Sequence, residues 1–167
     1  MSPQPEPWLR GPVPGVPKPL QPVAHALIQA LEEAEQATNG VSPADLWTAP
    51  GAAASVGWHL RHMAGALDRL FTYARGEALS DVQRAALRAE AMPTPEVSAE
   101  TLIRELRDTI ERALAQLRST APERLDDDRP VGRAQLPSTV RGLLHHAGEH
   151  TARHAGQVIT TAKIVQS

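Results

Sequence analysis

The sequence contains no cysteine. It therefore has no disulfide framework and no thiolate of its own, and the expected location of such a chain is the cytoplasm. Any thiol chemistry would depend on a sulfur atom carried by a small molecule. The N-terminus has neither the charged region nor the apolar stretch of a secretory signal peptide, which also favours a cytoplasmic location.

Long hydrophobic runs and an excess of one charge are also missing. No stretch of about 18 apolar residues is available to cross a bilayer, so we expect no membrane span. The formal net charge is −2 in 167 residues, and the lack of a basic stripe argues against direct nucleic-acid binding. Hydrophobic residues make up 41% and charged residues 22%, the balance of a single globular domain.

Proline is concentrated at the start of the chain. Residues 1–22 contain eight prolines, which is too many for a helix and favours an extended arm. Trp8, Leu9 and Leu20 are too apolar for a pure linker. We therefore expect part of this arm to lie along the main domain, residues 23–167.

The main domain carries four long amphipathic segments in which apolar residues recur at spacings of three and four. They predict helices from about Leu20 to Asn39, from after Ser55 to Gly76, from Ser98 to Leu117 and from about Ser138 to Ile164. A short helix is expected over 80–90, and an irregular loop with an extended piece over 121–139. Four long helices with connections of unequal length predict an all-α four-helix bundle.

Four of the seven histidines lie within residues 145–157. His146, His150 and His154 recur at a spacing of four, which places successive rings one helical turn apart and about 40° around the axis. Two such rings can converge on one ion, as in His-x-x-x-His zinc sites. A pair of this kind also occurs on ordinary solvated helix faces, so a metal site needs a further ligand from elsewhere.

The second predicted helix offers that ligand. Trp58, His62, Arg69 and Tyr73 lie close to one stripe, which we expect to face the bundle interior, and His59 lies about 60° from it. His62 could complete a metal site with the fourth helix. It could equally be a histidine at the edge of the core, hydrogen-bonded to a neighbour, and periodicity alone does not separate the two.

Two motifs together resemble the DinB/YfiT-like superfamily of metalloenzymes, and the resemblance covers nearly the whole chain. The motifs are W-x-x-x-H-x-x-x-x-x-x-R and H-x-x-x-H-x-G-Q, formed here by Trp58, His62, Arg69, His150, His154, Gly156 and Gln157. The resemblance implies an up-down-down-up four-helix bundle with a three-histidine metal centre. Its ligands fall on His62, His150 and His154, whereas His59, His145 and His146 lie outside the matched set.

A centre with three histidine ligands would leave positions of the ion open, which is typical of catalytic rather than structural sites. Neutral imidazoles suit zinc and nickel, with iron as a further candidate, and the sequence does not choose among these metals. Such an ion could lower the pKa of a bound thiol or water molecule. His146 lies one turn from His150. It could contact one of the three ligands without binding the ion itself, or it could be an alternative ligand.

Four further side chains are weaker candidates. Arg69 could bind a carboxylate or phosphate of a substrate, or it could pair with Glu90, Glu149 or another acid. Glu149, His146 and Tyr73 are candidate catalytic groups. Glu149 could orient an imidazole, but it could equally be a solvated side chain, and Tyr73 could be a packed ring with its hydroxyl at the surface.

The resemblance also implies particular chemistries, namely transfer of a low-molecular-weight thiol to an electrophile and thiol-dependent isomerisation. The leading prediction is therefore a metal-dependent thiol S-transferase of a detoxification type, acting on a small-molecule electrophile and a thiol. One alternative is a hydrolase that activates water, with Glu149 or His146 as the base. Another is a non-catalytic, stress-associated metal-binding bundle that pairs through an exposed apolar face; a homodimer is expected.

Overall fold

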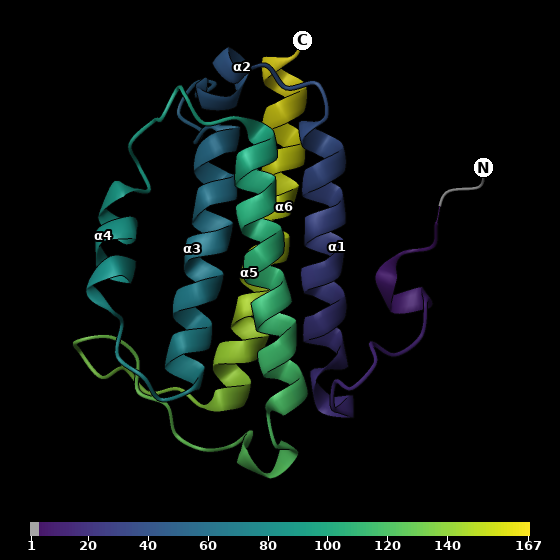
Figure 1. Cartoon of the computed structure of the whole chain (residues 1–167), viewed down its shortest axis with the longest axis vertical. Helices are drawn as coiled ribbons and strands as arrows, with labels where there is room; N and C mark the ends of the chain where they lie inside the picture. The colour runs from purple at the N-terminus through teal and green to yellow at the C-terminus, as the bar shows by residue number, and fades with distance from the viewer. Residues whose placement is uncertain (1–3) are drawn as a thin grey trace.

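The computed structural model describes residues 4–167 and forms a four-helix bundle (Figure 1). The long helices are α1 (Gln21–Thr38), α3 (Val56–Ala74), α5 (Ala99–Ser119) and α6 (Val140–Val165). The connections contain two short helices, α2 (Pro43–Trp47) and α4 (Asp81–Ala89), and three 3-10 turns, η1 (Pro7–Leu9), η2 (Lys18–Leu20) and η3 (Pro122–Arg124). Among the described residues there is no strand, and the predicted all-α bundle is confirmed.

The long helices follow the up-down-down-up order. In Figure 1, α1 and α6 run upward, whereas α3 and α5 run downward. Because α3 and α5 are consecutive long helices with the same direction, the chain must return from the lower end of α3 to the upper end of α5, and α4 lies on this return. Both α5 and α6 pack against α1 and α3.

One continuous core joins the four long helices. Leu27 of α1, Leu60 of α3, Leu106 of α5 and Leu144 of α6 are completely buried. Burying one such side chain contributes roughly 1.5–3 kcal/mol relative to leaving it exposed. The apolar stripes that predict the helices from the sequence are thus the surfaces on which they pack.

Side-chain caps set the starts of three of the long helices. Ser55, Ser98 and Thr139 each accept a hydrogen bond from a backbone N–H in the first turn of α3, α5 and α6. Caps of this kind satisfy N–H groups that have no partner within the helix. Helix α2 is not predicted by periodicity because it is too short to show a repeat. The loop over 121–139 contains two isolated β-bridges, which agrees with the extended piece expected there.

The proline-rich arm lies along α1. Arg10 of the arm donates two hydrogen bonds to Glu32 (2.6 and 2.7 Å), and Leu20 is buried as expected. Part of the arm thus lies along the domain, as expected, although Trp8 and Leu9 are 58% and 57% exposed. Side chains in a 3-10 turn point in directions about 120° apart, and in η1 the buried position is taken by Pro7.

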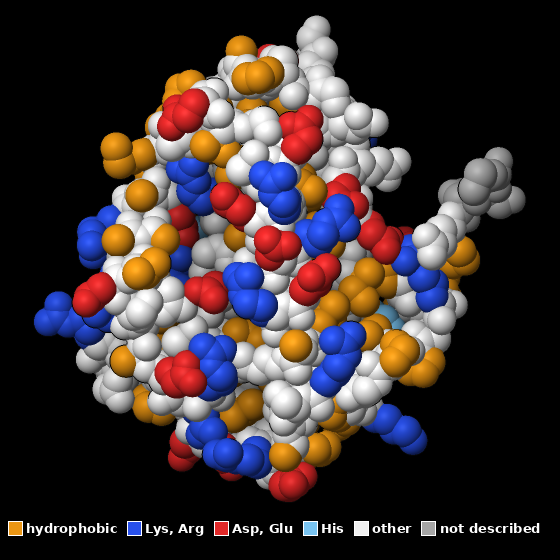
Figure 2. Space-filling model, in the orientation of Figure 1, with side chains coloured by type: hydrophobic (Ala, Val, Ile, Leu, Met, Phe, Trp, Pro, Cys, Tyr) orange, Lys and Arg blue, Asp and Glu red, His pale blue; other side chains and the backbone are white. Residues whose placement is uncertain are grey.

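Charged side chains of both signs are interspersed on the face that has α5 in front (Figure 2). Some of them are paired, as Arg107 is with Glu35 at 2.6 Å. Hydrophobic side chains lie among charged ones over α4, where Val82 and Leu87 are exposed. Of the helices within residues 4–167, none combines the length and apolarity that crossing a bilayer would require.

Candidate metal centre

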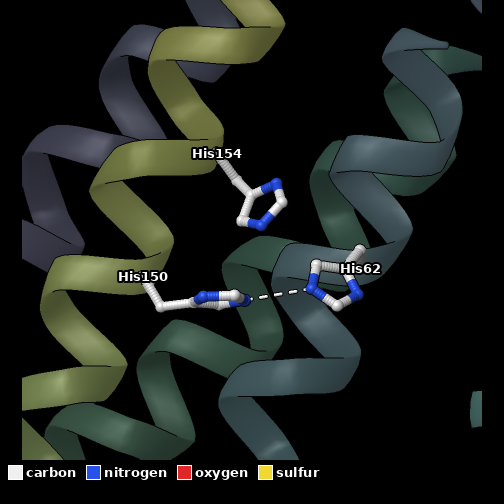
Figure 3. A group of neighbouring side chains, drawn as sticks. All are labelled: His62, His150 and His154. Carbon is white, nitrogen blue, oxygen red and sulfur yellow. Dashed lines mark hydrogen bonds between the residues drawn. The ribbon is translucent and has the colours of Figure 1, made fainter. Parts of the chain in front are cut away.

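Three histidine rings converge between α3 and α6 (Figure 3). His62, His150 and His154 each place one ring nitrogen within 4.8 Å of the others. The Nε2 atoms of His62 and His150 are 3.0 Å apart. The ring centroid of His154 lies 4.6 Å from that of His62 and 4.5 Å from that of His150. The structure thus brings together the three histidines singled out in the sequence.

The helical repeat of α6 explains why His150 and His154 meet α3 at the edge of the bundle. Ala147, Thr151 and Ala155 are buried in the core-facing side of α6. His150 and His154 lie on the adjoining face and are only half-buried, and the His62 side chain is 18% exposed. The cluster therefore lies at the rim of the α3–α6 interface, where its rings are partly exposed to solvent.

His150 and His154 of α6 are neutral near pH 7. Burial, together with the nearby rings of His62 and His150, lowers the pKa of His154 from 6.5 to about 4. Burial and His62 also lower the pKa of His150. A neutral imidazole carries a lone pair on one ring nitrogen, which is the form that binds a metal.

Glu90 determines which nitrogen of His62 carries the hydrogen. It follows α4 directly, is 5% exposed, and its Oε2 lies 2.8 Å from His62 Nδ1. Although burial raises the pKa of Glu90, hydrogen bonds from His62 and Arg69 hold it below its usual value. An ionised carboxylate only accepts hydrogen bonds, so Nδ1 is the donor and Nε2 of a neutral His62 ring has its lone pair toward His150.

His59 contacts the Nδ1 atom of His154, as Glu90 contacts the Nδ1 atom of His62. The two Nδ1 atoms are 3.0 Å apart, and His59 is 5% exposed. Burial, with a smaller contribution from His62, lowers the pKa of His59 to about 4. Because His154 turns Nδ1 to His59, its other nitrogen, Nε2, points toward the rings of His62 and His150 (Figure 3).

Trp58 forms one wall of the cluster. Its ring stacks on that of His62, with centroids 4.7 Å apart and planes 7° from parallel. It also lies 5.8 Å from the ring of His154. The tryptophan of the sequence motif thus restricts the orientation of the His62 ring on the side that Glu90 does not contact.

Arg69 is engaged in an ion pair. Its Nη1 donates to Glu90 Oε1 at 2.5 Å, and its side chain is 11% exposed. Of the two interpretations open from the sequence, a substrate clamp or a partner for an acid, this contact favours the second. Arg69 then acts on the cluster through Glu90, because the same carboxylate holds His62.

Of the other candidate catalytic side chains, His146 lies at the edge of the cluster, whereas Glu149 and Tyr73 lie outside it. His146 is half exposed, and its Nδ1 is 3.0 Å from Glu149 Oε2. Glu149 also accepts from Arg153. Tyr73 lies three turns along α3 from His62, where it lines a cavity of about 590 Å³ with Arg84 and other residues. The ring of His146 nevertheless reaches the cluster, because its centroid lies 5.4 Å from that of His150.

Glu90 is the residue whose importance the sequence did not reveal. The sequence identifies Glu90 only as one of several acids available to pair with Arg69. Gly65 gives a clue in retrospect, since a Cβ atom there would clash with Glu90 Oε1 and lie 2.8 Å from Arg69 Nη1. The spacing His62, Gly65, Arg69 leaves a notch in α3 that receives an acidic side chain.

Comparison with known proteins agrees with this architecture. A model of the DinB superfamily matches residues 26–158. The crystal structure of a conserved protein from Enterococcus faecalis superposes with a TM-score of 0.72 at 20% sequence identity, covering 86% of this chain and 95% of the other. At that identity the likeness concerns the fold alone. No curated protein matches the sequence.

Proposed function

The chain belongs to the DinB superfamily, and we propose that it is an enzyme that binds a divalent metal ion through His62, His150 and His154. The observation that carries this proposal is the convergence of three ring nitrogens within 4.8 Å, contributed by two helices. Ordinary surface histidines on one helix would not bring in a third ring from a neighbouring helix.

The donor set fits such an ion. The lowered pKa of His150 and of His154 keeps both rings neutral near pH 7. Glu90 leaves the lone pair of His62 on Nε2, which faces His150 Nε2 at 3.0 Å, a contact that a bound ion would replace. Borderline cations such as zinc and nickel suit imidazole nitrogen, and iron is a further candidate. When bound, the ion would supply Lewis acidity and lower the pKa of a thiol or water molecule.

We further propose that the reaction is transfer of a low-molecular-weight thiol to a small electrophile. The sulfur forms a bond to the electrophilic carbon, the leaving group departs with the electron pair of the broken bond, and the thiol proton passes to solvent. The chain has no cysteine, so no protein thiol competes with the small-molecule thiol for the metal. The half-buried rings leave one side of the cluster open, and Trp58 provides an apolar wall beside it.

The contacts of two carboxylates favour this reaction over hydrolysis. Activation of water is aided by a general base that is free to accept a proton. Glu90 is already held by His62 and Arg69, and Glu149 is held by His146 and Arg153. Hydrolysis is therefore the second candidate, and turnover of an ester or amide without added thiol would favour it.

The metal is tested by mass spectrometry of untagged protein. Near-stoichiometric metal in the wild type, falling sharply in both His62→Ala and His150→Ala, would support one ion shared by α3 and α6. His146→Ala is a matched control because His146 lies next to the cluster but is half exposed, and it should retain the metal. Absence of metal after reconstitution with zinc, nickel and iron would overturn the proposal.

The reaction is tested with the metal-loaded protein. Consumption of a thiol in the presence of alkyl halides, epoxides or activated alkenes should be faster than without protein and should be lost in His62→Ala. A loaded protein that neither consumes thiol nor hydrolyses esters would favour the non-catalytic metal-binding bundle. Sedimentation velocity would test the expected homodimer in the same samples.

A further inference from the structure

Helix α4 is held to the bundle mainly by polar contacts. None of its residues, Asp81–Ala89, is buried, so burial of apolar surface contributes little to its position. Near its start, Gln83 donates to Asp68 (2.6 Å) and Thr72 (2.8 Å) of α3. Near its end, Glu90 contacts α3. A helix attached in this way depends on a few specific hydrogen bonds.

The attachment through Glu90 is the one that reaches the histidine cluster. Glu90 is 5% exposed, and a buried carboxylate requires partners for both oxygens. One oxygen accepts from His62 Nδ1 at 2.8 Å and the other from Arg69 Nη1 at 2.5 Å. Gly65 provides the space, because a Cβ there would collide with the carboxylate. Three residues of α3, His62, Gly65 and Arg69, thus form a fitted socket for Glu90 at the end of α4.

We propose that Glu90 is a positioning residue that couples metal binding at His62 to the docking of α4. This inference rests on the metal centre proposed above. Docked Glu90 holds His62 as the Nδ1–H tautomer and so presents its Nε2 atom to the ion. A carboxylate on the outer nitrogen also makes a ligating imidazole more basic. By linkage, a metal that binds better with Glu90 docked must stabilise the docked position of α4 to the same extent.

A purely structural ion pair between Glu90 and Arg69 makes a different prediction. In that case, loss of Glu90 would lower the stability of the fold but would leave the His62 tautomer and the zinc affinity unchanged. The test therefore needs readouts of His62 itself and of α4, in addition to a measure of folding.

The decisive variant is Glu90→Gln, and Glu149→Gln is its matched control. Glu149 is also a glutamate hydrogen-bonded to a histidine, His146 Nδ1 at 3.0 Å, but that histidine is outside the three. Nitrogen-15 NMR of the metal-free protein reports the tautomer of each ring. We expect the Nδ1–H form of His62 in the wild type and in Glu149→Gln, and a mixture of tautomers in Glu90→Gln.

Zinc affinity, measured by competition with a chromophoric chelator, gives the second readout. Loss of such an outer partner typically weakens metal binding by about 10–100-fold, and we expect this range for Glu90→Gln. Glu149→Gln should stay within about twofold of the wild type. Hydrogen exchange gives the third readout: zinc should slow exchange over 81–90 in the wild type but not in Glu90→Gln.

Gly65→Ala keeps the test decisive if Glu90→Gln does not fold. Alanine favours a helix over glycine by about 1 kcal/mol, so this variant should retain α3 while pushing the carboxylate out of its socket. It should reproduce the loss of zinc affinity and of zinc-dependent protection. Wild-type zinc affinity and protection in a folded Glu90→Gln, or in Gly65→Ala, would overturn the coupling alone. If the wild type bound none of zinc, nickel and iron, the metal centre and the coupling would be overturned together.

Discussion

The Nδ1 atoms of His59 and His154 face each other at 3.0 Å. Two lone pairs at this distance would repel, so one of the two atoms must carry a hydrogen. If His154 is the donor, its Nε2 atom is free for a metal, and His59 acts as the outer partner of this ring in the way that Glu90 acts for His62.

Replacement of His59 should therefore weaken metal binding without removing a ligand. We expect His59→Phe to lower zinc affinity about tenfold or more, because the ring volume is kept but the acceptor is lost. Asparagine carries a polar atom near the position of Nδ1, so His59→Asn should recover part of the affinity. Competition with a chelator measures both. Equal affinities for His59→Phe and the wild type would limit His59 to a packing role.

The metal-free protein should lose stability as the pH falls from about 6.5 to about 4. Burial lowers the pKa of His59 and of His154 from 6.5 to about 4 in the folded state. Between these values the unfolded chain binds protons that the folded chain does not, so the free energy of unfolding decreases with decreasing pH. The slope is at most about 1.4 kcal/mol per pH unit for each histidine.

Urea unfolding at pH 7, 6, 5 and 4, followed by circular dichroism, measures this dependence. Because carboxylates also titrate near the lower end, the informative quantity is the difference between wild type and His59→Asn. The variant lacks one of the two histidines and should show a shallower loss of stability. Parallel curves for the two proteins would contradict the prediction.

Trp58 should report metal binding through its fluorescence. Its ring stacks on His62 at 4.7 Å, so a cation held by that imidazole changes the electric field at the indole. We expect zinc to change the emission of the wild type and of Trp8→Phe, since Trp8 lies in the exposed part of the arm. Trp58→Phe should still bind zinc but lose most of the emission change. An unchanged response in Trp58→Phe would show that another tryptophan is the reporter.

The core packing of α6 can be tested apart from the metal. Leu144 is completely buried, and truncation of such a leucine usually costs about 2–5 kcal/mol. Leu144→Ala should lower the free energy of unfolding by that amount. Ile164→Ala, at a position of the same helix that is 53% exposed, should change it by no more than about 0.5 kcal/mol. Similar losses in both variants would contradict the burial seen here.

The sequence was sufficient for the bundle and for the positions of the three central histidines. Apolar residues at helical spacing identify the packing faces, and the spacing of His150 and His154 places two rings on one side of α6. His62 shares a stripe with other inward residues of α3, but periodicity leaves it open as a core-edge histidine, and the resemblance to the DinB/YfiT-like superfamily selects it as the third ligand. The first two inferences depend on the geometry of single helices, which local sequence determines.

The partners of those rings could not be predicted in this way. His59 lies about 60° from the His62 stripe by helical geometry, yet it is buried against His154. Glu90 reaches His62 from a different helix, across a separation of 28 residues. Both contacts depend on the distances and angles at which the helices pack. The periodicity of apolar residues carries no information about these quantities.

The parallel course of α3 and α5 has an evolutionary consequence. Two consecutive helices that both descend cannot be joined by a tight turn, so every protein with this topology carries a long return segment alongside α3. Here that segment carries the carboxylate of Glu90, which touches the histidine cluster. A change within this segment can therefore alter the surroundings of the rings while the four long helices keep their packing.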